Sequence, residues 1–249
     1  MSIFSINIFG IHIAPTYYGL AYALGFILGY YFLRKLRFIK ETELEDLMMY
    51  AFFGVILGGR FGYILFYNLS FYLTTPSEIL KFWNGGMSFH GGVIGVIIAM
   101  IIFSKRYKKD FFDIGDNLVC ALPIGLFLGR IGNYINKELL GMPYEGFLAV
   151  YKGGIGYFPS PLLEAFLEGI ILFFLINHLY KKRKHKGEIG GFFLLFYGIF
   201  RFSVEFIRQP DPQLGYISGF LTMGQILSIP MIIAGVYLVY FFKGYPNEK

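Results

Sequence analysis

The chain of 249 residues contains a single cysteine, Cys120, which lies inside an apolar run. One cysteine has no intrachain partner, and this excludes a disulfide framework. A thiol that takes part in chemistry is therefore expected to belong to a substrate. The sequence also lacks any His/Cys cluster or close set of carboxylates with the spacing of metal ligands. We therefore predict neither a metal site nor a cofactor.

The first 15 residues lack a basic n-region and a small-residue cleavage site, so we expect no removable signal peptide. What the chain has in abundance is apolar side chains: 56% of its residues are hydrophobic, 20% are aromatic, and the mean hydropathy is +0.58. Soluble domains contain about 45–50% apolar residues. The composition therefore indicates an integral membrane protein.

Seven apolar segments approach the roughly 20 residues that a membrane-spanning helix needs. They cover residues 17–34, 47–67, 88–104, 115–135, 161–180, 190–207 and 222–242. The pattern predicts an all-α membrane protein with seven transmembrane helices in a single integral membrane domain, residues 1–249.

Lysine and arginine collect at the ends of the odd-numbered segments. Fifteen lie there, against four on the opposite side: Arg34, Lys35, Arg37, Lys40, Lys105, Arg106, Lys108, Lys109, Lys181, Lys182, Arg183, Lys184, Lys186, Lys243 and Lys249 against Lys81, Lys137, Lys152 and Arg208. Short cytoplasmic loops carry the basic excess. We therefore expect the N-terminus outside and the C-terminus in the cytoplasm. The net charge of +6 then mainly reflects topology, and nothing indicates a nucleic-acid partner.

Three arginines, Arg60, Arg130 and Arg201, lie within helices that run from inside to outside, each past the middle of its helix. In the helices that run from outside to inside, His90, Glu164 and Glu168 fall in the first turns, which again lie in the outer half of the membrane. A charged side chain in hydrocarbon costs at least ~2.5 kcal/mol and needs a partner. The expected partner of Arg130 is an anionic lipid phosphate. The polar groups converge at outer-leaflet depth, which favours a site that acts on a lipid.

The outer connections 69–86 and 136–160 are rich in glycine, proline and aromatic residues. We expect them to form a small extracytoplasmic cap. Glycines also recur at four-residue spacing, as in Gly54, Gly58 and Gly62 and in Gly91 and Gly95, which indicates close helix packing.

His90 stands where a glycine-rich loop enters a helix, and histidine is the natural general base near neutral pH. It can equally be a histidine that only hydrogen-bonds a loop. Ser88 nearby lacks the Gly-x-Ser-x-Gly pattern of a nucleophile elbow, so serine catalysis is not expected.

Arg201 and Glu205 are four residues apart and share a helix face. Either they form a structural ion pair, or Arg201 is available to bind a ligand. The planar guanidinium binds two phosphate oxygens at once, and Arg130 and Arg201 together can hold one phosphate. Arg60 either completes that site or packs against a glutamate. Asn133, one turn beyond Arg130, can donate to a phosphate oxygen. Asn136 and Glu138 lie at the helix end, where helix capping and loop fixing explain them as well as catalysis does. For Glu164 we prefer pairing with an arginine.

Two rival functions remain. A transporter or lipid-binding protein would use the arginines only to pair with glutamates. A metal-dependent phosphatidyl transferase would need an aspartate-rich cytoplasmic motif, for which Asp110, Asp113 and Asp116 have poor spacing.

Several segments together resemble the prolipoprotein diacylglyceryl transferases, over most of the chain. They are residues 17–20 (YYGL), 85–95 (GGMSFHGGVIG), 129–141 (GRIGNYINKELLG), 201–211 (RFSVEFIRQPD) and 223–229 (MGQILSI). The resemblance implies an enzyme of the bacterial inner membrane with its active site toward the outer leaflet. Its substrates would be phosphatidylglycerol and prolipoprotein signal peptides with a lipobox cysteine. Diacylglyceryl transfer to that thiol would form a thioether and release glycerol 1-phosphate.

The family's important positions carry over as Tyr18, His90, Arg130, Asn133, Glu138, Gly141, Arg201 and Glu205. The resemblance implies that His90, Arg130 and Arg201 are catalytic and that Arg130 also binds phosphatidylglycerol, together with Tyr18, Asn133, Glu138, Gly141 and Glu205. We add Arg60 to the binding residues because of its place in an outward-running helix. One segment departs: the family usually has Pro-Ser-Gln-Leu-Tyr-Glu where this chain has Pro-Ser-Pro161-Leu-Leu163-Glu164. Either His90 activates the thiol or an arginine network does so while His90 orients the substrate.

Overall fold

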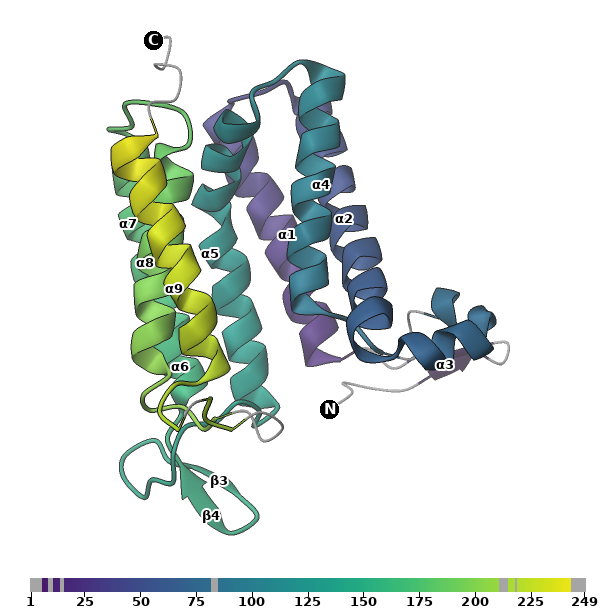
Figure 1. The fold of residues 1–249 in the computed structure, drawn as a ribbon, viewed down its shortest axis with the longest axis vertical. Coiled ribbons are helices and arrows are strands. Elements are labelled where there is room, and N and C mark those ends of the chain that lie inside the picture. Colours follow the sequence, from purple (N-terminus) through teal and green to yellow (C-terminus); the bar gives the residue numbers. More distant parts are fainter. Residues whose placement is uncertain are drawn as a thin grey trace. The chain divides into compact units, whose positions relative to one another are not determined.

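The computed structural model describes residues 6–8, 11–13, 16–81, 85–210, 215–217 and 219–242. Helices occupy all seven ranges that the apolar pattern predicts (Figure 1). The first four are α1 (Tyr17–Leu36), α2 (Glu41–Tyr67), α4 (Phe89–Tyr107) and α5 (Phe111–Ile135). The fifth is the unbroken series α6 (Ser160–Glu164), η3 (Ala165–Ile171) and α7 (Leu172–Tyr180); the last two are α8 (Glu188–Val204) and α9 (Met223–Val236), which η4 (Tyr237–Phe241) continues.

Five of these helices, or helix series, are long and apolar enough to cross a membrane. They cover Glu41–Tyr67, Phe89–Tyr107, Phe111–Ile135, Ser160–Tyr180 and Met223–Phe241. Many of their large apolar side chains stay exposed, among them Ile98, Phe174 and Ile233. Such an apolar surface is expected of a multi-pass membrane protein. The basic residues Lys243 and Lys249, which contributed to the predicted orientation, lie outside the described residues.

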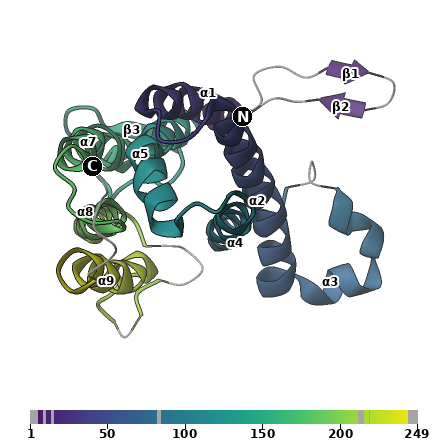
Figure 2. The ribbon, with the colours of Figure 1, turned by 90° about the horizontal axis from the view of Figure 1, so that it is seen from above.

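The chain forms two compact units, one of residues 36–115 and the other of residues 1–35 with 116–249. In the first unit, α2 and α4 lie side by side (Figures 1 and 2). Their glycines allow the backbones to touch: a Cβ on Gly58 would lie 2.4 Å from the Gly91 carbonyl oxygen, and one on Gly95 would lie 2.0 Å from that of Gly54. The close packing predicted from the glycine spacing is confirmed for this pair.

The same unit contains α3 (Leu69–Thr74) and the 3₁₀ helix η1 (Pro76–Leu80) between α2 and α4. Helix α4 begins where the Ser88 hydroxyl accepts a hydrogen bond from the Gly91 amide, 3.2 Å away. The Ser88 amide in turn donates to the Gly59 carbonyl at 2.8 Å. Ser88 is therefore a buried helix cap that ties the start of α4 to α2.

In the second unit, α8 and α9 also pack through glycines, since a Cβ on Gly235 of α9 would lie 2.7 Å from the Gly191 carbonyl oxygen of α8. The buried Asp116 carboxylate accepts hydrogen bonds from the Gly187 and Gly190 amides, both at 2.8 Å, and so caps the start of α8. In the first unit, Asp110 accepts from the Asp113 amide. Capping therefore accounts for Asp110 and Asp116, two of the three aspartates considered for metal chemistry.

The connection after α5 forms a two-stranded hairpin of β3 (Val150–Lys152) and β4 (Ile155–Tyr157), in which Val150 pairs with Tyr157. A separate pair, β1 (Ile6–Ile8) and β2 (Ile11–Ile13), precedes α1. The hairpin turns at Gly153 and Gly154, whose φ angles of 60° and 82° favour glycine. The segment 136–160, for which a role in an outer cap is predicted, thus contains a two-stranded hairpin.

Candidate functional site

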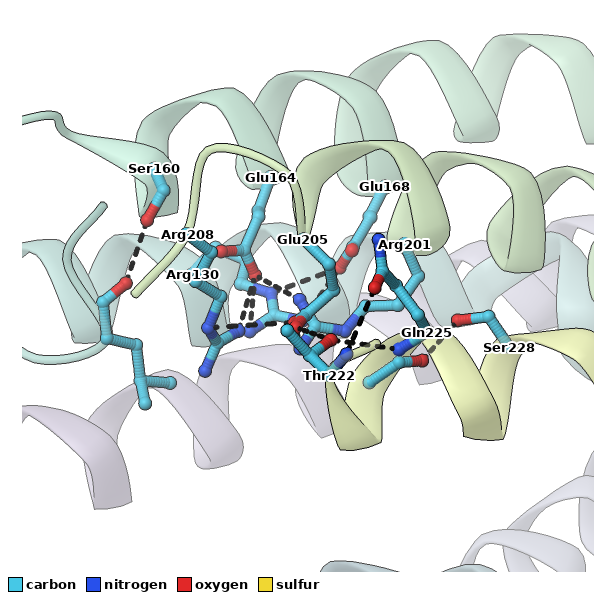
Figure 3. Close-up of polar contacts among 12 residues, drawn as sticks. Arg130, Ser160, Glu164, Glu168, Arg201, Glu205, Arg208, Thr222, Gln225 and Ser228 are labelled. Carbon is cyan, nitrogen blue, oxygen red and sulfur yellow. Dashed lines mark hydrogen bonds and ion pairs between the residues drawn. The ribbon is translucent and has the colours of Figure 1, made fainter. Parts of the chain in front are cut away.

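Three arginines and three glutamates meet in the second compact unit (Figure 3). Arg130 comes from the C-terminal part of α5, Glu164 ends α6, and Glu168 lies in η3. Arg201 is in the last turn of α8. Glu205 and Arg208 follow directly after that helix. We call these six side chains the arginine–glutamate cluster.

Glu164 contacts all three arginines through one carboxylate oxygen. Its Oε2 lies 2.7 Å from Arg130 Nη1, 3.5 Å from Arg201 Nη1 and 3.4 Å from Arg208 Nη1. The other two carboxylates lie at the sides: Glu168 Oε2 accepts from Arg130 Nε at 3.1 Å and Nη2 at 2.8 Å, and Glu205 pairs with Arg201. The three cations therefore converge on the space that one anion occupies.

Solvent reaches the arginines of the cluster but not Glu164 or Glu168. The Glu164 and Glu168 side chains are fully buried, whereas those of Arg130, Arg201 and Arg208 are 15%, 17% and 13% exposed. Burial and the neighbouring Arg201 cation lower the pKa of Arg208 from the usual arginine value. Three like charges this close need the carboxylates, or another anion, to stay together.

Two oxygens of the cluster, Oε1 of Glu164 and Oε1 of Glu168, are buried and have no hydrogen-bond partner among the described residues. Buried polar atoms are almost always paired, so an orphan at such a place calls for an explanation. Both oxygens can accept a hydrogen bond from a ligand. The cluster thus offers donors on the arginines and acceptors on the glutamates.

Glu168 lies in η3, a π-helical segment that interrupts the α6–α7 series. Such wide turns occur often at functional sites. Gly169 allows this segment to touch α5, because a Cβ there would lie 2.6 Å from the Phe127 Cβ. Pro161, one of the two departures from the family pattern, is tolerated locally because it occupies the first turn of α6, where a missing amide is harmless.

Glu205 is held against the start of α9. The Thr222 hydroxyl donates to Glu205 Oε2 at 2.5 Å, and Thr222 and Gln225 form a reciprocal capping box at 3.2 and 3.0 Å. Gly224 leaves room for the carboxylate, since a Cβ there would lie 2.5 Å from Glu205 Cδ. The start of α9, which includes the motif at residues 223–229, therefore positions Glu205. Glu205 in turn positions Arg201, with which it forms an ion pair.

Gly141 performs a similar task for Arg208. A Cβ on Gly141 would lie 2.6 Å from the Ile207 carbonyl oxygen, and Gly141 pairs with Arg208 in an isolated β-bridge. The Met142 amide donates to the same Ile207 carbonyl at 2.9 Å. The loop after α5 thus fixes the backbone that carries Arg208.

The other predicted residues of this unit differ in burial. Asn133 is buried and lies one turn beyond Arg130, as its spacing predicts, and its carbonyl accepts from the Glu138 amide at 2.9 Å. The Glu138 side chain is exposed. The side chain of Tyr18 lies outside the described residues.

His90 and Arg60 lie in the other compact unit. His90 is exposed in the first turn of α4, its ring edge-on to Phe89 at 5.7 Å between centroids. Arg60 is 2% exposed, and its guanidinium lies 5.1 Å from the Tyr72 ring centroid. It donates to five backbone carbonyls, those of Glu78, Ile79, Lys81, Gly85 and Gly86. These contacts hold the loop that leads to His90.

From the sequence, Arg208 counts only among the charges of the outer loops. Glu168 is expected at the same depth as the other polar groups, and it is a partner of the arginines only in the rival binding or transport function. The signal for Arg208 was its spacing: Arg201, Glu205 and Arg208 at i, i+4 and i+7 share one helical face. No group of three or more His, Cys, Asp or Glu in the described part of the chain could hold a metal ion.

The sequence matches known proteins along nearly its whole length. The family model of prolipoprotein diacylglyceryl transferase matches residues 3–241. A phosphatidylglycerol–prolipoprotein diacylglyceryl transferase of Nitratidesulfovibrio vulgaris (strain DP4) is 44% identical over 234 residues, 90% of this chain and 88% of the relative. Proteins of the same name are 44% identical in Rickettsia felis, over 91% of this chain and 92% of the relative, and 45% identical in Francisella tularensis subsp. holarctica (strain LVS), over 93% and 91%.

These matches include both compact units and every segment that builds the arginine–glutamate cluster. Together with the apolar helices and the segments 85–95, 129–141, 201–211 and 223–229, they decide the family. The chain belongs to the prolipoprotein diacylglyceryl transferase family.

Proposed function

We propose that this chain transfers the diacylglyceryl group of phosphatidylglycerol to the thiol of a lipobox cysteine in a prolipoprotein signal peptide. The observation that carries the proposal is the convergence of Arg130, Arg201 and Arg208 on the position of one carboxylate oxygen. A phosphodiester is an anion of the size and charge that such a set of guanidinium groups binds. The names of the curated relatives supply the two substrates.

In this reaction the cysteine sulfur attacks the glycerol carbon that bears the phosphate. The carbon–sulfur bond forms as the carbon–oxygen bond breaks, and the bonding electrons leave with glycerol 1-phosphate. Negative charge grows on the leaving phosphate, where Arg130 and Arg201 act as preorganised donors in a low-dielectric site. Removing one such donor typically lowers turnover about 10²–10³-fold. No step of this scheme requires a metal.

The thiol proton must also leave, because the thiolate is the good nucleophile. We assign His90 as its acceptor, since an exposed ring at the start of α4 is open to a substrate. The alternative is that the arginines stabilise the thiolate directly while His90 orients the peptide. The phosphatidylglycerol site in this proposal is completed by Asn133, Glu138, Gly141, Glu205 and Tyr18. Arg60, whose N–H groups are taken up by five backbone carbonyls, supports the loop that leads to His90 instead of binding the lipid itself.

The proposal includes a topology of seven transmembrane helices in one membrane domain, with the N-terminus outside and the C-terminus in the cytoplasm. The basic clusters support this orientation. In it, the cluster faces the outer leaflet of the bacterial inner membrane, and the segments 69–86 and 136–160 form a small extracytoplasmic cap. That leaflet is where phosphatidylglycerol and an exported signal peptide can meet.

The test uses purified protein in detergent with phosphatidylglycerol, a lipobox peptide and a chelator, and follows glycerol 1-phosphate release. Release that requires the cysteine, and is lost in a Cys→Ser peptide, supports the transfer. Release that appears only when a divalent ion is restored would point to a metal-dependent lipid enzyme. Bound lipid without release in either condition would favour the binding or transport function, in which the arginines only pair with glutamates.

A further inference from the structure

The three arginines of the cluster have separate partners at its sides and one partner in common. Glu168 pairs with Arg130, and Glu205 pairs with Arg201 and lies 3.9 Å from Arg208. Glu164 reaches all three with the same oxygen. Its carboxylate oxygen lies between the three guanidinium groups, and its side chain is fully buried there.

A phosphate that bridges Arg130 and Arg201 needs the donors that Glu164 now uses. Arg130 Nη1 lies 2.7 Å from Glu164 Oε2 and Arg201 Nη1 lies 3.5 Å from it. A phosphate oxygen and this carboxylate oxygen cannot both occupy the point between them. Binding of a headgroup and retention of Glu164 therefore compete for the same hydrogen bonds.

The competition matters most after the reaction. Phosphatidylglycerol carries one negative charge, whereas a phosphate monoester carries about −1.5 to −2 at pH 7. The three arginines alone would hold the product more tightly than the substrate. A site with that property is inhibited by its own product unless something takes the arginines back.

We propose that Glu164 is a built-in competing anion that sets the affinity of the arginines for phosphate and returns to them to expel glycerol phosphate. The inference rests on the proposed function, because it assumes that the cluster binds the phosphate of the substrate. Glu164 is then a residue that tunes product release, in addition to its structural pairing with the arginines.

The test is Glu164→Gln, which keeps the shape of the side chain and removes its charge. Inhibition by sn-glycerol 1-phosphate is expected to tighten about tenfold, because its competitor for the arginines is gone. The KM for phosphatidylglycerol should fall and kcat should fall with it, since release becomes slow. A merely structural role predicts the opposite for KM, because unpaired arginines would lose their geometry.

Two matched variants sharpen the result. Glu168→Gln removes the same charge from the same cluster but leaves Glu164 on all three arginines, so its effect on product inhibition should be clearly smaller. Glu145→Gln, on the exposed loop before the hairpin, should leave inhibition unchanged. Equal tightening in Glu164→Gln and Glu168→Gln would overturn the special place of Glu164.

Direct binding of sn-glycerol 1-phosphate to the purified variants, measured by calorimetry, separates this inference from the proposed function. Unchanged or weaker binding in Glu164→Gln overturns the inference even when the wild type turns over normally. Missing thiol-dependent turnover in the wild type overturns the proposed function, whatever the binding shows. If Glu164→Gln does not fold, Glu164→Asp, which withdraws the carboxylate by one methylene, decides by the same measurement: tighter binding supports the inference and unchanged binding overturns it.

Discussion

At the scale of single residues, the cluster pairs each arginine with two glutamates. Buried ion pairs of this kind add little net stability, because desolvation offsets most of the attraction. Their value is that the guanidinium groups are already oriented when an anion arrives. The same pairing makes each member hard to remove, since its partner is left with an uncompensated buried charge that costs about 3–5 kcal/mol.

Arg130→Ala and Arg201→Ala are each expected to lower thiol-dependent release of glycerol 1-phosphate by about 10²-fold or more, as for other donors to a leaving group. Arg201→Lys keeps the charge but loses the planar fork, so it should recover only part of the rate. Lys182→Ala, on the exposed loop between α7 and α8, is the control. Thermal unfolding checks that each variant is folded. Near-normal turnover in either alanine variant would show that this arginine does not bind the phosphate.

His90→Gln tests the assignment of the base. The side chain is exposed, so the substitution should not change the melting temperature. Loss of a general base typically lowers turnover about 10²–10⁴-fold. Turnover is measured against pH in both proteins, because loss of a general base should change the pH profile of the reaction. Full activity with an unchanged pH profile in the glutamine variant would leave His90 as an orienting residue.

At the scale of elements, the contact between α2 and α4 depends on glycine. Gly95→Ala places a methyl group 2.0 Å from the Gly54 carbonyl oxygen, so the helices must move apart. Overpacking of this kind costs about 1–3 kcal/mol, and the melting temperature should fall. Gly92→Ala on the same helix meets only the Val55 carbonyl oxygen at 3.7 Å, an ordinary contact, and should melt like the wild type. Equal melting of both variants would refute the packing argument.

The start of α9 is an element that acts on the cluster from outside it. Thr222→Val removes the hydroxyl that donates to Glu205 and caps α9, so turnover should fall and stability should fall by about 1 kcal/mol. Thr222→Ser retains both hydrogen bonds and should retain both properties. A valine variant that loses stability but keeps kcat would mean that Thr222 is only a helix cap.

At the scale of the whole molecule, the orientation can be read by cysteine labelling. The native Cys120 is fully buried, so it should contribute little background. Lys152→Cys in the hairpin and Lys182→Cys between α7 and α8 lie on opposite predicted sides, and both positions are exposed. A membrane-impermeant thiol reagent applied to spheroplasts should label the first and spare the second. The reverse pattern would invert the proposed topology.

The positions of the helices could be predicted from the sequence alone. A helix that crosses the hydrocarbon core needs a minimum length and an apolar composition, and both can be read directly from the residues. The sequence also determined that Arg130 and Arg201 need partners, because an unpaired charge in that environment is costly. The family followed from short segments that carry unusual polar residues at fixed spacing. The pairing of Arg201 with Glu205 could be predicted for the same reason, since i, i+4 neighbours share a helix face.

Only the tertiary structure decided which charges meet. Glu164 contacts Arg208 although the two residues are 44 positions apart in the sequence. The periodicity of a single helix cannot predict a contact between residues so far apart along the chain. The support of Glu205 by Thr222, 17 positions away, likewise depends on how the segments pack. The pattern of apolar and polar residues along the chain indicates whether a segment lies in water or in lipid. The partner of a buried charge depends instead on how the segments pack against one another.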